Sequence, residues 1–372
     1  MKICYLTQSV IPSSTADSVQ SMHMCHGLVQ AGHEVILVAP DRPLPEPVSG
    51  EAHAYYGVPA SFEIEKIPWT LIAGRAYLYG YQAARRCARI RPEIVYSRSL
   101  WEAMFAAWLG LPTVFEAHGA VGGRISGSFL PRFLKSKNLK RVVVISEALK
   151  HVFTEQYGYP EKRIVLARDA ADVPEAPSTP SAPWPGRPGN LQIGYVGSLV
   201  SGRGLDLIGK LASSLPALDF HILGGTAGQI AHWKNRLAVG NLYFRGNKDP
   251  GEIPAHLQAF DILLAPYQQK VSIGLGDYET TQWMSPMKLF EYMAAGKAIV
   301  CSDLPALREF MVHHENCLLC PPDDAAAWQA ALVLLAGDPA LRQRLGACAR
   351  REVEEKYTWK KRGEIVLEGL GS

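Results

Sequence analysis

The segment from Ser285 to Gly296 combines the start of a helix with charged side chains suited to binding an anion. Serine is a favourable N-cap residue, and proline at the first helical position loses no intrahelical hydrogen bond, so we expect Ser285 to cap a helix that begins at Pro286. The free N–H groups and the positive dipole at this end favour a phosphate. Lys288 adds a cation in the first turn, where it opposes the dipole unless a bound anion compensates.

Glu291 lies three residues after Lys288 and on the same helix face. A carboxylate behind a phosphate site suits a ribose, because it accepts hydrogen bonds from two neighbouring hydroxyls. The alternative is an ordinary capped helix whose apolar residues pack inward while Lys288 and Glu291 pair at the surface. Spacing alone leaves both readings open. Gly296 is expected to end the helix, and residues 297–302 to form a short buried strand.

A second candidate phosphate site is the glycine-rich segment 197–204, which follows a predicted strand and precedes a predicted helix. Its backbone amides are suited to cradling a phosphate, with Arg203 adding a guanidinium. A nucleotide-binding P-loop is excluded, because Gly204 stands where that motif needs a serine or threonine for magnesium. A tight turn with a solvent-exposed arginine remains the alternative.

His118 lies in the polar segment 116–119, directly after a predicted strand. Polar side chains at the carboxyl edge of a parallel sheet are candidates for ligand binding. The alternative for a lone histidine is a core residue whose ring nitrogens are already hydrogen-bonded.

Buried strands alternate with helices along most of the chain, which predicts parallel sheets covered by helices. At 372 residues the chain exceeds what one core usually serves. Residues 173–190 contain six prolines and few large apolar residues, the composition of a linker. We therefore expect an N-terminal domain over 1–172, the linker, and a C-terminal domain over 191–345. A helical segment over 346–372 is expected to pack back toward the N-terminal domain.

Composition narrows the classes of function and the compartment. A net charge of +3 and 48% hydrophobic residues fit a globular protein and argue against a nucleic-acid binder. Seven cysteines without a framework spacing indicate free thiols in a reducing, cytoplasmic compartment. No apolar run reaches the ~18–20 residues of a membrane span. The basic segment 124–141 suggests peripheral contact with anionic lipid, although an ordinary solvated helix face fits as well.

Taken together, these motifs resemble the retaining nucleotide-sugar glycosyltransferases of family 4. The similarity rests on 197–204, on Leu223-Gly224-Gly225, on the strand from Asp261 to Pro266, and on Glu291 to Gly296. It extends to Tyr357-Thr358-Trp359 and to the N-terminal half. The resemblance implies the GT-B fold: two Rossmann-like α/β domains with parallel sheets, facing each other across a cleft.

The resemblance also implies roles for individual residues. Glu291 is expected to hold the ribose, Arg203 and Lys288 the diphosphate, and His118 the donor sugar. Other donor-binding positions are Gly197, Ser198, Gly202, Gly204, Gly246, Asn247, Pro266, Ser285, Pro286 and Met287. Gly246 and Asn247 are expected to meet the base.

Three departures from the family pattern concern the donor sugar more than the reaction class. The usual first glutamate of the motif is Trp283, so Asp277 or Glu279 is a candidate replacement. Ser198 and Arg203 stand where arginine and lysine are common. The N-terminal loop lacks paired glycines and offers polar residues as an acceptor loop, namely Ser14, Thr15, Asp17 and Ser18.

The expected activity is transfer of a hexose, with retained configuration, from a UDP- or GDP-sugar to a hydroxyl of a glycan, glycolipid or small molecule, as in polysaccharide biosynthesis. Neither a metal nor another cofactor is expected. The alternatives are a sugar-nucleotide epimerase with the GT-B fold and a non-catalytic module that binds nucleotide or glycan.

Overall fold

The computed structural model describes residues 1–43, 50–174, 186–270 and 281–370. The chain separates into two compact units, one of 1–169 together with 358–372 and the other of 170–357. The C-terminal segment 346–372 is thus divided: its first part belongs to the second unit and its last part to the first. Most of the predicted linker lies outside the described residues.

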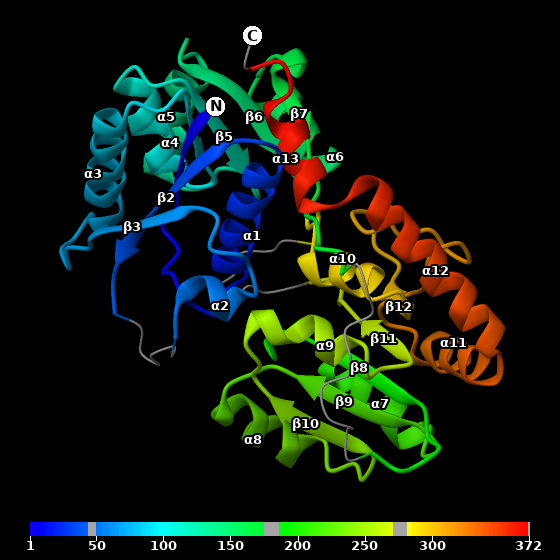
Figure 1. The fold of residues 1–372 in the computed structure, drawn as a ribbon. Helices are drawn as coiled ribbons and strands as arrows, with labels where there is room; N and C mark the ends of the chain where they lie inside the picture. The colour runs from blue at the N-terminus through cyan, green and yellow to red at the C-terminus, as the bar shows by residue number, and fades with distance from the viewer. Residues whose placement is uncertain (44–49, 175–185, 271–280, 371–372) are drawn as a thin grey trace. The chain divides into compact units, whose positions relative to one another are not determined.

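The N-terminal unit is built on a seven-stranded parallel sheet in the order β3-β2-β1-β4-β5-β6-β7 (Figure 1). Its strands are β1 (Lys2–Leu6), β2 (Glu34–Asp41), β3 (Glu63–Pro68), β4 (Ile94–Ser97), β5 (Thr113–Ala117), β6 (Leu139–Val144) and β7 (Ile164–Leu166). The central strands are nearly continuous runs of buried apolar residues, as expected for a parallel sheet covered on both faces.

Helices lie on both faces of this sheet. The helices of the unit are α1 (Ala16–Gln30), α2 (Ala52–Tyr56), α3 (Arg75–Ile90), α4 (Leu100–Trp108), α5 (Arg124–Leu134), α6 (Glu147–His151) and α13 (Trp359–Leu367). Helices α3, α4 and α5 lie on one side of the sheet and α1 with α13 on the other (Figure 1). The chain moves from β1 to β2 toward one edge of the sheet and from β4 through β5 to β6 toward the other edge. Because the crossovers are right-handed, their helices lie on opposite faces of the sheet.

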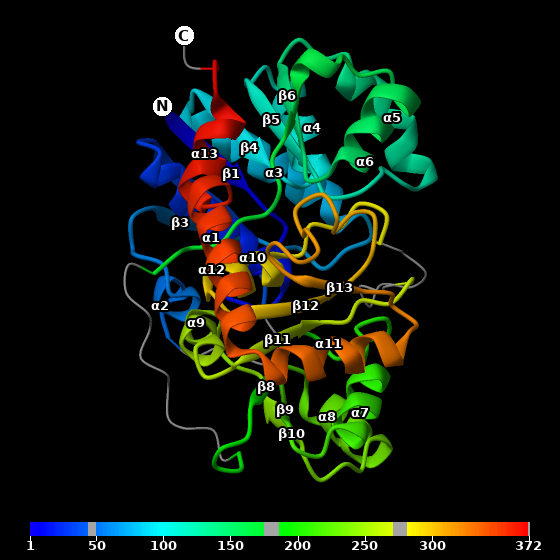
Figure 2. The same ribbon diagram turned by 90° about the vertical axis from the view of Figure 1, so that its right-hand side faces the viewer.

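The C-terminal unit contains a six-stranded parallel sheet in the order β10-β9-β8-β11-β12-β13. Its strands are β8 (Gln192–Val196), β9 (Asp219–Leu223), β10 (Leu242–Gly246), β11 (Ile262–Ala265), β12 (Ala298–Ser302) and β13 (Leu318–Cys320). Its helices are α7 (Leu205–Ser214), α8 (Ala227–Arg236), α9 (Ile253–Leu257), α10 (Met287–Ala294), α11 (Ala325–Gly337) and α12 (Pro339–Lys356). Figure 2 shows α12 and α13 following one another along the chain.

The final helix is fixed to the N-terminal sheet by a buried ion pair. Arg362 donates from Nη1 to Oε2 of Glu116 at 3.0 Å, and its Nη2 lies 2.9 Å from Oε1. Both side chains are almost completely buried, and Arg362 also donates to the backbone oxygens of Ala167 and Arg168. Because the Arg362 guanidinium and the hydrogen bond from His118 outweigh burial, the pKa of Glu116 lies well below its usual value.

Removing one member of this pair should destabilise the N-terminal unit. We expect Arg362→Met to cost about 3–5 kcal/mol, because it leaves the Glu116 carboxylate buried without its cation. The double variant Glu116→Gln/Arg362→Met should recover part of the loss. Urea unfolding checks both. Since the pKa of Glu116 is lowered by folding, the stabilisation should be full above the usual carboxyl pKa and disappear as the pH falls through the lowered value. A cost below 1 kcal/mol would contradict the assignment.

Candidate functional site

Helix α10 begins one residue later than the sequence predicts. Its first residue is Met287, and Pro286 occupies the cap position with φ −75° and ψ 117°. The prediction that Ser285 caps the helix and Pro286 opens it is therefore wrong by one position. Proline fixes φ but leaves ψ free, and here ψ is extended, so helical geometry starts after Pro286. Ser285 is buried just before the helix, and Gly296 (φ 67°) ends it as expected.

Lys288 reaches from α10 to the end of β8. A Cβ added at Gly197 would lie only 2.5 Å from Lys288 Nζ, so a glycine here makes room for the ammonium group. Tyr292, one turn further along α10, binds the same strand end: the Val196 N–H donates to its hydroxyl at 2.8 Å. Lys288 and Tyr292 of α10 therefore both lie against the end of β8.

Two tyrosine rings form a platform for the site's cations. Lys288 Nζ lies 4.2 Å from the ring centre of Tyr195 and 5.3 Å from that of Tyr267. The guanidinium of Arg203 lies 5.2 Å from the Tyr267 ring. Contacts between a cation and an aromatic face stabilise charges taken out of water. The sequence analysis did not single out these tyrosines, although both stand at the carboxyl ends of predicted strands.

The charge environment of Lys288 favours an added anion. Burial lowers the pKa of Lys288 well below its usual value, the neighbouring Arg203 guanidinium lowers it further, and Glu291 opposes the shift. Glu291 is half-buried, one helical turn away. Two cations thus lie close together in a partly desolvated place, where a bound diphosphate would offset both costs.

The glycine-rich segment after β8 has a tight backbone geometry. Gly202 and Gly204 have φ of 83° and 76°, values that favour glycine. A Cβ at Gly204 would lie 2.1 Å from the backbone oxygen of Pro266, at the end of β11. Gly202 accepts a hydrogen bond from the Gln268 N–H at 2.9 Å. The segment is therefore held against β11, and Arg203 extends from a fixed backbone.

Two further strand ends adjoin Gly197. Gly224 follows β9, and a Cβ there would lie 2.2 Å from the Gly197 backbone oxygen. Gly224 N–H donates to the backbone oxygen of Gly246, at the end of β10, at 2.7 Å. Asn247 is exposed beside this point, and Ser198 is exposed beside Gly197. The predicted donor-binding positions of the C-terminal unit thus gather at one edge of its sheet.

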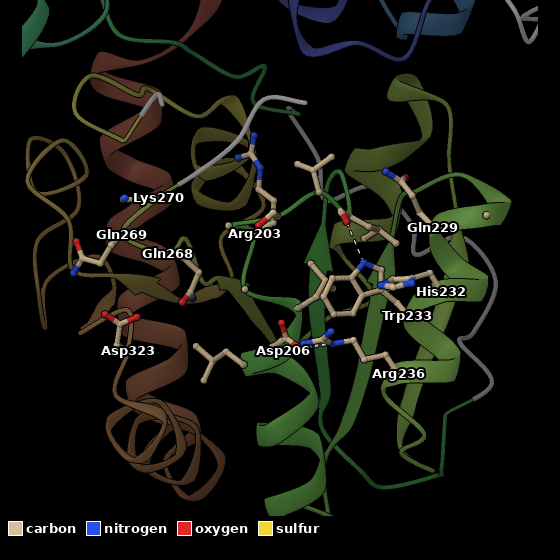
Figure 3. A pocket seen from close by; sticks show the side chains of 18 residues that line it. Arg203, Asp206, Gln229, His232, Trp233, Arg236, Gln268, Gln269, Lys270 and Asp323 are labelled. Atoms are coloured by element: carbon tan, nitrogen blue, oxygen red, sulfur yellow. Dashed lines mark hydrogen bonds and ion pairs between the residues drawn. The ribbon is translucent and has the colours of Figure 1, made fainter. Parts of the chain in front are cut away.

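A cavity of about 890 Å³ opens beside the glycine-rich segment (Figure 3). Arg203 lines it together with residues from the start of α7, from α8 and from 268–270. Trp233 forms part of its wall, and its Nε1 donates to the Leu199 backbone oxygen at 3.0 Å. Lys288 and Glu291 are not among the residues that line it. Arg203 therefore lines the cavity and also contacts the Tyr267 ring.

His118 lies at the carboxyl edge of the N-terminal sheet, just after β5. Its side chain is partly exposed, and Nε2 lies 2.5 Å from Oε1 of the buried Glu116. Because a carboxylate accepts hydrogen bonds, this contact assigns the proton to Nε2 and leaves Nδ1 as the second polar atom of the ring. Glu116 therefore fixes the orientation of the His118 ring. The sequence analysis included Glu116 in the polar segment 116–119 but gave it no role.

The predicted acceptor loop is also at this edge, at the start of α1. Ser14 and Thr15 are exposed, whereas Asp17 is half-buried and accepts a hydrogen bond from Ser9 at 2.5 Å. Ser18 is fully buried, and its hydroxyl donates to the Ser13 backbone oxygen at 2.7 Å. In this loop the Thr15 hydroxyl lies 3.0 Å from that of Ser13, and the Ser18 hydroxyl holds the loop backbone.

Asp277 and Glu279 lie outside the described residues. Trp283 is half-buried, and its Nε1 is buried without a hydrogen bond to any described residue. Among the residues that the structure covers, no group of three or more His, Cys, Asp and Glu side chains is arranged to hold a metal ion. None of the described helices combines the length and apolar character needed to span a bilayer.

Two family models match this chain. Residues 18–173 match Glycosyltransferase Family 4, and residues 190–338 match Glycosyl transferases group 1. Glycogen synthase of Mycobacterium tuberculosis is 24% identical over 91% of this chain and 86% of its own length. Phosphatidyl-myo-inositol mannosyltransferase of Mycolicibacterium smegmatis is 31% identical over 40% of this chain and 36% of its own.

The chain belongs to the family 4 glycosyltransferases.

Solved structures confirm the fold of this family 4 glycosyltransferase. Sucrose-phosphate synthase from Thermosynechococcus elongatus has a TM-score of 0.71 at 15% identity, covering 97% of this chain and 96% of that one. HepE of Anabaena, solved with UDP-glucose, has a TM-score of 0.70 at 14% identity, covering 100% and 99%. The predicted fold class, GT-B with two parallel-sheet α/β domains, is confirmed.

The lowered pKa of Lys288 predicts a pH dependence of stability. Between that value and the usual lysine pKa the unfolded chain binds more protons, so stability should rise with pH, by at most about 1.4 kcal/mol per unit. We expect Lys288→Met to remove this slope and to raise stability at neutral pH. Urea unfolding at several pH values tests it, with Lys210→Met as the control because Lys210 is exposed on α7. Equal slopes in wild type and Lys288→Met would exclude a depressed pKa.

Proposed function

We propose that this glycosyltransferase transfers a hexose from a UDP- or GDP-sugar to an acceptor hydroxyl with retention of configuration. The observation that carries the proposal is the convergence of Lys288 and Arg203 over Tyr267, beside the glycine backbone at the end of β8. A site with two cations and little side-chain bulk suits a diphosphate. The structures of HepE with UDP and with UDP-glucose support a nucleotide-sugar donor.

In this proposal each part of the site has one task. Arg203, Lys288 and the start of α10 bind the diphosphate, and Glu291 accepts hydrogen bonds from the ribose hydroxyls. Gly246 and Asn247 meet the base. His118 contacts the donor sugar through Nδ1, because its Nε2 is directed at Glu116.

The chemistry required of the protein is stabilisation of the departing diphosphate. As the bond between the sugar and the diphosphate breaks, negative charge grows on the leaving oxygen, where preorganised cations act most strongly. The acceptor hydroxyl attacks from the face that the diphosphate leaves, which retains the configuration, and a donor phosphate oxygen takes its proton. This route requires no divalent metal. The acceptor is a glycan, a glycolipid or a small molecule.

Removing either charged residue of α10 should slow transfer strongly. We expect Lys288→Met to lower the rate by about 10²–10³, the scale for losing one group that stabilises developing charge. Glu291→Gln should also slow transfer, because it weakens the hydrogen bonds that hold the ribose. Initial rates with UDP- and GDP-sugars over a panel of acceptors measure this. Lys210→Met removes an exposed lysine of α7 and should keep wild-type rates. Unchanged turnover in both site variants would overturn the assignment.

Binding of nucleotides separates the alternatives. A nucleotide at 100 times its dissociation constant stabilises by about 2.7 kcal/mol, so UDP, GDP and ADP can be ranked by thermal shift without added metal. A shift with one nucleotide that is lost in Lys288→Met supports the donor site. Conversion of the sugar nucleotide without acceptor would identify an epimerase. Binding without turnover over all acceptors would identify a non-catalytic module.

A further inference from the structure

The outer surface of α3, α4 and α5 in the N-terminal unit has a connected set of aromatic side chains, which we call the aromatic surface. Its members are Tyr77, Tyr81, Trp101, Phe105, Trp108 and Phe129. Each ring contacts at least one other, with centroid separations from 4.3 to 6.5 Å. The set is therefore one continuous apolar area, unlike the single exposed apolar residues that any protein surface carries.

Part of the aromatic surface is open to solvent. Tyr81 and Phe129 are 40% exposed and Trp108 is 36% exposed. Two aliphatic residues of the loop before α3 are exposed further, Leu71 at 78% and Ile72 at 49%. Large apolar side chains of this exposure on three helices and the loop before α3 indicate a surface that is covered when the protein works.

The helices that carry the aromatic surface, together with the segments that connect them, have a strongly basic sequence. From residue 69 to residue 146 the sequence has twelve Lys and Arg against three Asp and Glu. Two of these three acids, Glu102 and Glu116, are fully buried, which leaves Glu93 as the exposed one. Exposed cations lie on the same helices or directly after them, namely Arg75, Arg85, Arg89, Arg132, Lys135 and Lys137.

Two of these cations contact the aromatic surface itself. The guanidinium of Arg132 lies 5.4 Å from the Trp108 ring centre, and that of Arg85 lies 5.8 Å from the Tyr81 ring centre. Tryptophan and tyrosine half-exposed beside arginine are the composition of a protein surface at a lipid headgroup layer, where the rings enter the boundary and the cations meet phosphates.

We infer that the aromatic surface binds the surface of an anionic lipid bilayer. The apolar rings alone would suit a protein partner or a second copy, but their basic border complements a surface of negative charge. This assignment includes the segment 124–141 that the sequence suggested and extends it to α3 and α4, because the ring contacts continue from Phe129 through Trp108 and Phe105 to Tyr81. It does not depend on the proposed transfer reaction.

Vesicle flotation tests the inference on the full chain. Binding is expected to vesicles of phosphatidylcholine mixed with phosphatidylglycerol, to be much weaker with phosphatidylcholine alone, and to fall as salt is added. Trp108→Ser/Phe129→Ser should lower the partition coefficient at least tenfold. Arg132→Ser and Lys135→Ser should each lower it about fivefold, the factor that corresponds to about 1 kcal/mol per basic residue.

Matched controls distinguish binding by the aromatic surface from nonspecific binding by exposed apolar or basic residues elsewhere. Val333→Ser/Leu334→Ser removes two apolar side chains of α11 that are 53% and 45% exposed, and Lys210→Ser removes an exposed cation of α7. Both should bind vesicles as the wild type does. Trp108→Phe should keep binding but lose part of the tryptophan quenching by brominated lipid.

Three results would overturn the inference. The first is absence of binding to the anionic vesicles at low salt, with circular dichroism showing a folded chain. The second is an equal loss of binding in the surface variants and the α11 control. The third is a lipid-free wild type that sediments as a dimer and becomes a monomer in Trp108→Ser/Phe129→Ser, which would assign the surface to self-association.

Discussion

The close approach of backbone at the carboxyl edge of the C-terminal sheet is the constraint on which the candidate site depends. Gly197, Gly224 and Gly246 end three neighbouring strands, and side chains at the first two would collide with the Lys288 ammonium or the adjoining backbone. The space left by the missing side chain of Gly197 is occupied by the ammonium group of Lys288. Removing the side chains thus admits a cation to the sheet edge and leaves backbone groups available to a ligand.

The two units use buried charge in opposite ways. In the N-terminal unit Glu116 and Arg362 neutralise each other, with additional hydrogen bonds to the remaining polar atoms, as a stable buried ion pair requires. In the C-terminal unit Lys288 and Arg203 carry the same sign, and burial disfavours the charge of Lys288. An arrangement that costs stability without a ligand is characteristic of a binding site, because a bound anion supplies the missing charge.

The sequence predicted the central strands of both sheets and missed those with weaker patterns. Strands β3, β7 and β13, which we did not predict, all lie at sheet edges. Strand β3 has charged side chains at three of its six positions, and β7 and β13 have only three residues each, too few for a periodic pattern. The sequence analysis singled out Lys288 and Glu291 from helix-start chemistry. The two tyrosine rings that contact Lys288 were not predicted. Tyr195 and Tyr267 come close to the same lysine only because β8 pairs with β11, and local spacing in the sequence does not reveal that pairing.

Contacts between residues far apart in the sequence also explain why His118 could be recognised as a candidate while its partners could not. Its orientation depends on Glu116, and the charge of Glu116 depends on Arg362, 246 positions further along the chain. Arg362 in turn is held where α13 crosses α1 closely, at Gly27 and Gly363, since a Cβ at either glycine would collide with the other helix. A histidine at the edge of the first sheet is therefore oriented by the last helix of the chain. That helix acts on the histidine through the carboxylate that it neutralises.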